Sequence, residues 1–338
     1  MTTIIDFSEL TAEPDLVTIG VLDANRNVLN RVARVIRSAA QLAWVAAEED
    51  PAALAERLSQ DTVLLACEDA AVDLALQWCE HRFAQAHLAV WSHDPTATLI
   101  ERALRNDRLV SLLGWPSFQS MPRSWELALA ARQILRPHSE PTAIGDVLAG
   151  TPVTVEFRPR SFSDREAVAG HGANFVERCG GSSRTCAKVA EVIHELTMNA
   201  TYDAPVDRDG EPRYAYDRRA PIELEDGEVP LIQCATDGML AAVAVTDPFG
   251  RLTREHVLTS IQRGYEAGRS TQAQVVDSSR GGAGLGMWRV YSSAAVTIVD
   301  VIPGHSTSVT AVFDIDVSPR EARTLPPSLH LFDRGRLG

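Results

Sequence analysis

The stretch Val189–Asp203, VAEVIHELTMNATYD, decides the fold expected for the second half of the chain. Its apolar residues recur at steps of three and four, which is the period of a helix with one buried face. Glu191, Glu195 and Asn199 are spaced by four, so they stack on a different face of that helix. A carboxylate one turn before a carboxamide suits a water and a hard cation such as Mg²⁺. A solvated polar face has the same spacing, and this reading stays open.

Two later segments form a pattern with this helix. Val245–Leu252, VTDPFGRL, ends a short apolar strand at Asp247 and then turns. Arg280–Met287, RGGAGLGM, is rich in glycine and opens a helix expected over 285–293. Glycines let the backbone approach an anion closely, and the first N–H groups of a helix point toward it. The order of the three segments is more specific than any one of them.

This order resembles the ATP-binding domain of the GHKL superfamily, which includes gyrase, histidine kinases and MutL. Within it, residues 150–316 are most similar to the anti-sigma-factor serine kinases of bacterial partner-switching systems. The resemblance implies ATP and Mg²⁺ as ligands, with Glu195 as the catalytic base and Asn199 as the Mg²⁺ ligand. It implies that Asp247 accepts a hydrogen bond from the adenine amino group. The other nucleotide contacts that it implies are Gly250, Gly282, Gly284, Leu285 and Gly286.

The first glycine box departs from the family pattern Asp-x-Gly-x-Gly. Phe249 and Arg251 stand at its two glycine positions, where they would fill the adenine slot or, for Phe249, stack on the base. Two functions therefore stand side by side. One is an ATP-dependent protein serine/threonine kinase acting on a small antagonist or sigma-factor-like regulator. The other is a non-catalytic signalling scaffold that binds partner proteins. A homodimer is an expectation from the resemblance alone.

Residues 16–136 alternate five strand patterns with five helix patterns, which predicts a doubly wound, five-stranded parallel sheet. This part resembles a response-regulator receiver domain. Asp23 keeps one acidic position, but Ala66 stands where the phosphoacceptor aspartate would be, and Trp115-Pro116 replaces the lysine-proline step. Phosphoryl transfer would lack its nucleophile and its cation. We therefore expect a pseudo-receiver that serves as an interaction module, with an unrelated doubly wound domain as the alternative.

The expected domain limits follow from these patterns. Residues 1–15 form an arm, 16–136 the receiver-like domain, 137–150 a linker, 151–317 an α/β two-layer sandwich of the ATPase type, and 318–338 a mobile tail. A flexible lid is expected over 252–279. His138 lies between two prolines, so the dimerisation helix of a conventional histidine kinase cannot run there.

Composition limits the partners. The chain of 338 residues carries a net charge of −13, which disfavours nucleic acid and anionic membranes as partners. No apolar run is long enough to cross a bilayer, and the first residues lack a signal-peptide pattern. The five cysteines include no CxxC pair, which is typical of reduced thiols in a cytoplasmic protein.

Overall fold

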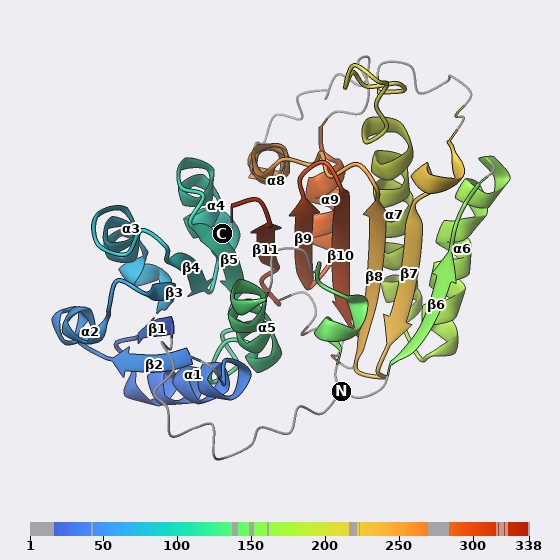
Figure 1. Ribbon diagram of the computed structural model, residues 1–338. Coiled ribbons are helices and arrows are strands. Elements are labelled where there is room, and N and C mark those ends of the chain that lie inside the picture. Colours follow the sequence, from blue (N-terminus) through green and yellow to red (C-terminus); the bar gives the residue numbers. More distant parts are fainter. Residues whose placement is uncertain are drawn as a thin grey trace, which may run out of the picture.

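The structure is a computed structural model of the chain. It describes residues 17–41, 43–136, 141–148, 152–160, 162–215, 222, 224–269, 284–315, 317, 321 and 324–336. The named strands form one mixed sheet of 11 strands in the order β2-β1-β3-β4-β5-β11-β9-β10-β8-β7-β6 (Figure 1). The expected α/β class is therefore confirmed. The two parts that the sequence separates into domains share this single sheet.

The first five strands of the chain run parallel, in the spatial order expected of a doubly wound unit. They are β1 (Val17–Leu22), β2 (Ala43–Glu48), β3 (Thr62–Glu68), β4 (His87–Ser92) and β5 (Leu109–Gly114). The helices between them are α1 (Arg26–Ala39), α2 (Pro51–Arg57), α3 (Val72–His81) after the short turn η2 (Asp69–Ala71), α4 (Pro95–Arg105) and α5 (Ser124–Leu135). Asn25, Asp50 and Asp94 cap the N-termini of α1, α2 and α4 through their side-chain oxygens.

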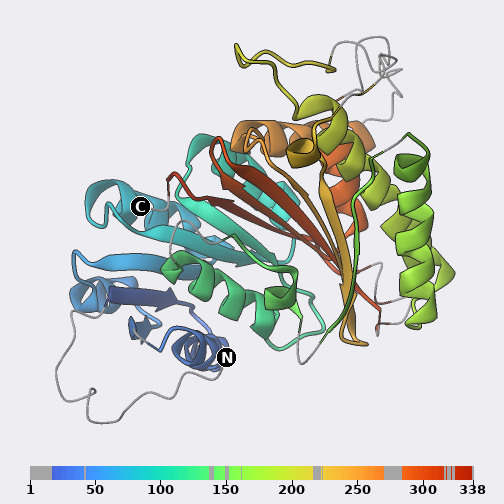
Figure 2. The same cartoon turned by 45° about the vertical axis from the view of Figure 1, so that its right-hand side comes forward.

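The strands of the second half are mainly antiparallel. They are β6 (Val153–Phe157), β7 (Leu231–Thr236), β8 (Leu240–Asp247), β9 (Val296–Ile302) and β10 (Ser306–Asp314). The helices are α6 (Phe162–Arg178), α7 (Ser183–Met198), α8 (Arg254–Arg269) and α9 (Gly286–Ser293), with the turns η3 (Ile144–Val147), η4 (Asn199–Asp203) and η5 (Asp226–Glu228). A two-layer unit is the result, because α6, α7, α8 and α9 pack into one apolar cluster on one face of the sheet (Figure 2).

The C-terminal segment is not a tail. Its described residues contain β11 (Ser328–Asp333), which pairs antiparallel with β5 and parallel with β9. Leu329 and His330 are fully buried there, in the middle of the sheet. This strand lies between β5 of the first half and β9 of the second half. Its backbone N–H and C=O groups therefore find hydrogen-bond partners on both sides, which favours its burial.

Helices cover the two faces of the sheet unequally. One apolar cluster runs along a whole face, from α2, α3 and α4 to α8, α9, α7 and α6. On the other face, α1 and α5 cover the parallel half. The antiparallel half is covered there by residues 141–148, whose Ile144 and Val147 are buried against β8 and its neighbours. This part of the expected linker therefore belongs to the core.

The expected lid is a regular helix over its first part. Helix α8 buries Val257, Leu258, Ile261 and Gly264, so its first three turns are packed, while its last residues, 266–269, are helical but exposed. The remaining lid residues, 270–279, and Arg280 lie outside the described residues. Among the described residues, no helix combines the length and the apolarity needed to cross a bilayer.

Candidate functional site

Helix α7 and the turn that follows it carry the first side of the site. Ser182 caps the helix, because its Oγ accepts a hydrogen bond from the Thr185 N–H at 3.2 Å. The predicted core-facing residues are all buried; they are Val189, Val192, Ile193, Leu196 and Ala200. After Met198 the helix widens into a π turn, in which the Ala204 N–H donates to the Asn199 carbonyl at 3.0 Å. π turns are rare in proteins, and those that occur are often found at functional sites.

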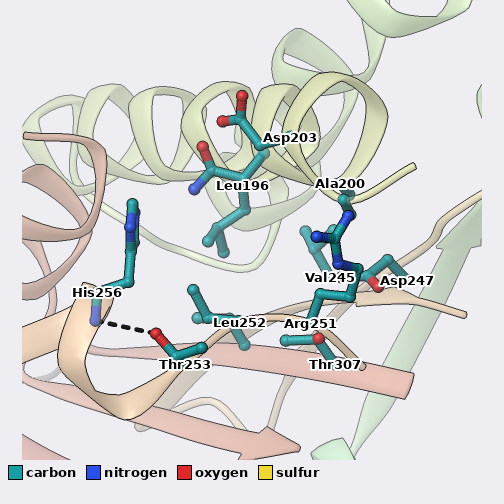
Figure 3. A pocket seen from close by; sticks show the side chains of 13 residues that line it. Leu196, Ala200, Asp203, Val245, Asp247, Arg251, Leu252, Thr253, His256 and Thr307 are labelled. Atoms are coloured by element: carbon teal, nitrogen blue, oxygen red, sulfur yellow. Dashed lines mark hydrogen bonds between the residues drawn. The ribbon is translucent and has the colours of Figure 1, made fainter. Parts of the chain in front are cut away.

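A pocket of about 250 Å³ lies between this turn, β8, β10 and the start of α8. Figure 3 shows Leu196, Ala200 and Asp203 from the helix on one side, facing Leu252, Thr253 and His256 on the other. The lining residues are Leu196, Asn199, Ala200, Asp203, Ala204, Val245, Asp247, Arg251, Leu252, Thr253, His256, Thr307 and Val309. More of the wall surface is apolar than polar, although seven of the thirteen lining residues carry polar or charged side chains, and small-molecule sites combine the two in this way.

Asp247 supplies a buried carboxylate to this pocket. It is the last residue of β8, is only 8% exposed, and pairs in register with Thr307 of β10. Burial raises the pKa of Asp247 to about 6, although the backbone N–H groups of the turn that follows, Phe249 and Gly250, favour the ionised form. The Phe249 N–H donates to Asp247 Oδ1 at 2.9 Å. A buried acceptor of this kind selects ligands that carry an N–H or O–H donor.

The structure brings the glycine-rich turn against the α7 residues that the sequence singles out. A Cβ on Gly286 would lie 3.0 Å from Glu195 Oε2 and 3.7 Å from Asn199 Oδ1. Gly286 is the first residue of α9, so the absence of a side chain allows this helix to start on top of the two polar groups. Asn199 lines the pocket, whereas Glu195 is not among the lining residues.

Glu195 is held by an arginine that the sequence analysis did not consider. Arg289 Nη1 donates to Glu195 Oε1 at 2.5 Å, across from α9 to α7. The Arg289 side chain is 56% exposed and that of Glu195 is 17% exposed. The expected catalytic base is therefore half-buried and ion-paired.

The remaining expected contacts that the structure describes, Gly250, Gly284, Leu285 and Gly286, are not among the lining residues. Gly250 has a φ of +63°, and a Cβ there would lie 2.2 Å from the Ile302 carbonyl oxygen, so its role is to pack against the β9–β10 turn. Gly284 also has a φ of +63° and precedes α9, and Leu285 occupies the N-cap position of that helix. Gly282 lies outside the described residues. Phe249, considered as an aromatic wall for the base, does not line the pocket, whereas Arg251 does.

Several lining residues were missed by sequence reasoning. Asp203 lies four residues after Asn199, in the quoted stretch itself, and continues the same spacing. Thr253 and His256 were assigned to a flexible lid, but they open α8, where the His256 N–H donates to Thr253 Oγ1 at 3.2 Å. Thr307 could be found only from the pairing of β10 with β8, which a single sequence does not reveal.

The wall formed by residues 251–253 is tied to the parallel half of the sheet by Arg254. Its guanidinium donates to the carbonyls of Ala103, Asn106 and Leu109, at distances down to 2.7 Å. Burial lowers the pKa of Arg254 to about 10. These carbonyls lie at the end of α4 and the start of β5, so the cation satisfies groups that a helix end leaves free.

The first half of the chain places two acidic groups, Asp23 and Asp69, directly after its strands β1 and β3. Asp69 accepts a hydrogen bond from Ser92 Oγ at 2.5 Å, and Asp23 accepts one from Trp91 Nε1 at 3.1 Å. Burial and the charge of Glu68 raise the pKa of Asp23 to about 6, against the hydrogen bonds that it accepts. Ala66 lies within β3 and is buried. The pseudo-receiver role stays a prediction.

Comparisons with known proteins add little to this geometry. No family model matches the chain, and no curated protein matches it. Among solved structures, the SiaB–SiaC complex from Pseudomonas aeruginosa is similar over 48% of this chain and 89% of the matched chain, with 16% sequence identity and a TM-score of 0.32. A likeness at this TM-score carries no argument about fold or function.

Proposed function

We propose that this protein is a signalling regulator that binds ATP with Mg²⁺ in the pocket between η4, β8, β10 and residues 251–256. The observation that carries the proposal is the buried carboxylate of Asp247, which lines an apolar pocket together with the carboxamide of Asn199. An ionised carboxylate without water around it favours a ligand that donates a hydrogen bond, and an apolar wall favours a flat ring.

The proposal makes adenine the preferred base. Adenine presents an exocyclic amino group, which donates to Asp247. Guanine presents a carbonyl oxygen at the corresponding ring position, and two acceptors facing each other in a buried site repel. The apolar contacts would come from Leu196, Ala200 and Val245, which lie around the same pocket. A site built to hydrogen-bond one donor rejects an analogue that lacks it.

At the polar side, Asn199 would hold the Mg²⁺ through Oδ1, with phosphate oxygens and water as the other ligands. Arg251 and His256 also line the pocket and would face phosphate oxygens. When bound, ATP supplies the γ-phosphoryl group: a bond forms from an attacking hydroxyl oxygen to phosphorus, the bond to the β-phosphate oxygen breaks, and Glu195 takes the hydroxyl proton. The acceptor that we propose is a serine or threonine of a protein partner, either a small antagonist or a sigma-factor-like regulator.

Calorimetric titration of ATP with Mg²⁺ tests the proposal. Asp247→Ala and Asn199→Ala should each weaken binding by roughly 10- to 100-fold, the effect of losing a hydrogen bond to a charged group. GTP should bind more weakly than ATP to the unchanged protein. Asp61→Asn, at an exposed turn before β3, is the matched control and should bind as the unchanged protein does. Absence of binding at millimolar ATP by a folded protein would refute the proposal.

A second candidate function is a scaffold without phosphoryl transfer. The observation that favours it is the ion pair between Glu195 and Arg289, which occupies the expected base. If this second function is correct, the protein binds ATP but does not transfer labelled γ-phosphate to any partner protein that it binds. Transfer of label to a captured partner, lost in Glu195→Gln, would rule the scaffold out.

A further inference from the structure

The carboxylate of Glu195 is covered by the first turn of α9. One oxygen, Oε1, accepts the hydrogen bond from Arg289 at 2.5 Å. The other, Oε2, faces the Cα of Gly286 so closely that a Cβ there would lie only 3.0 Å away. Both oxygens therefore face α9, and neither belongs to the pocket that Asn199 lines one helical turn later.

This position has a chemical consequence. A general base must reach the proton that it takes within about 2.6–3.2 Å, or through one water. Glu195 meets the Arg289 guanidinium within this distance, lies beside Gly286, and is not among the residues that line the pocket. While the ion pair is closed, Oε1 is occupied by the guanidinium, and the carboxylate faces α9 rather than a hydroxyl placed in the pocket.

We infer that Arg289 is an inhibitory clamp on Glu195, which permits nucleotide binding and suppresses phosphoryl transfer until the guanidinium moves away. The inference rests on the proposed function, and it deepens that proposal by naming how the site is restrained. Arg289 is a positioning residue in this scheme, because it acts through Glu195 and not on the nucleotide.

The clamp is built on a fixed helix. Met287 and Val290 of α9 are buried, and Trp288 lies directly over Gly264 of α8, where a Cβ would be 2.0 Å from Trp288 Cγ. The backbone that carries Arg289 is therefore packed, and the guanidinium can move only by rotating its own side chain. That side chain is 56% exposed, so water can replace the contact and the pair opens without unfolding α9.

Three variants test the clamp: Arg289→Gln, Glu195→Gln and the double variant. Arg289→Gln should bind ATP with Mg²⁺ as tightly as the unchanged protein, and its ATP turnover should rise by about tenfold or more, because a freed general base contributes at least that much. The double variant should show no rise, since the gain acts through Glu195. Arg289→Lys keeps a cation and should keep turnover low.

Arg57→Gln serves as the matched control. It breaks an arginine–glutamate pair with Glu48 on α2 and β2, far from the pocket, and should change neither binding nor turnover. A turnover of Arg289→Gln that equals or falls below that of the unchanged protein, with ATP affinity intact, overturns the clamp and leaves the proposed function standing. If the unchanged protein does not bind ATP, the proposed function is overturned, and the clamp with it.

A measurement on the nucleotide-free protein adds a readout that does not depend on turnover. The melting temperatures of the same three variants form a double-mutant cycle. The shifts of Arg289→Gln and Glu195→Gln should not add up in the double variant, because each single change removes the same contact. Additive shifts would show that the two side chains do not interact in solution, and would overturn the clamp.

Discussion

The ionisation of Asp247 links the pocket to pH. Its folded pKa of about 6 lies above the ordinary value of 3.8, because burial disfavours the charged form. A carboxyl whose pKa is raised on folding contributes stability that is fully present below pH 4 and is lost as the pH rises through 6. The same ionisation turns the side chain into the acceptor that the proposed ligand needs. The ionised form of Asp247, which is the form that would accept a hydrogen bond from the ligand, therefore makes the folded protein less stable than the protonated form does.

This gives a prediction for Asp247→Asn, which removes the charge. Between pH 4 and pH 7 the unchanged protein should lose up to about 3 kcal/mol of unfolding free energy relative to the variant, the value that corresponds to the shift in pKa. Urea unfolding at several pH values measures this difference. Comparison with the variant cancels the contribution of Asp23, whose pKa is raised to a similar value. Curves that stay parallel over this range would contradict the assignment.

At the scale of elements, the contact between α8 and α9 positions the start of the glycine-rich helix. Gly264 of α8 faces the ring of Trp288. The backbone N–H of Trp288 donates to Oγ of Ser260, which is also on α8, at 3.3 Å. The two helices approach closely only because position 264 has no side chain. A larger residue must push α9, and with it Arg289, away from α8.

We therefore predict that Gly264→Ala destabilises the protein by about 1–3 kcal/mol, the usual effect of overpacking. Gly268→Ala is the matched control in the same helix, because nothing lies within 4 Å of a Cβ at that position. The control should be neutral or more stable by up to about 1 kcal/mol, since alanine favours helix. Chemical denaturation of both variants decides between them, and an equal effect at the two positions would contradict the packing that we describe.

Most elements could be predicted from the sequence because their signals are local. The 3.6-residue period of α7 and the caps at Asn25, Asp50 and Asp94 lie within a few residues of what they determine. Helix α8 was missed, since Gly264 and Gly268 weaken its pattern and the expected lid suggested a loop. In the site, Asp247 could be predicted because it ends a strand pattern, and Asn199 because it follows the helix pattern. Thr307 could not, because its place in the pocket results from the pairing of β10 with β8.

At the scale of the whole molecule, β11 joins the two halves. It was missed because its partners are remote in sequence, and its flanks, rich in proline and arginine, are typical of a tail. Buried hydrogen bonds connect β11 and the residues after it to both halves. Toward β5, the Gly114 N–H donates to Ser328 Oγ at 2.8 Å, and His330 Nδ1 lies 3.0 Å from Ser111 Oγ. Arg334, just after the strand, pairs with Asp300 of β9 at 2.6 Å.

Leu329→Ala should therefore destabilise both halves together. Leu329 is fully buried, and the loss of its side chain should cost about 2–5 kcal/mol. Hydrogen exchange of amides in β5 and β9 should speed up in parallel, because the strand pairs with both. Trp44→Ala, on the exposed side of the edge strand β2, should leave exchange in β9 unchanged. Faster exchange on one side of β11 alone would mean that the halves unfold separately.

The place of β11 also sets the order of events while the chain is made. Leu329 pairs with Leu112, 217 positions earlier (329 − 112), so at a synthesis rate of about 5–20 residues per second the free side of β5 waits roughly 10–40 s for its partner. During that time the parallel half presents an open strand edge, which is a template for pairing with another chain. A nascent chain of this protein is therefore most exposed to misassembly late in translation, when nearly all of its other strands can already pair.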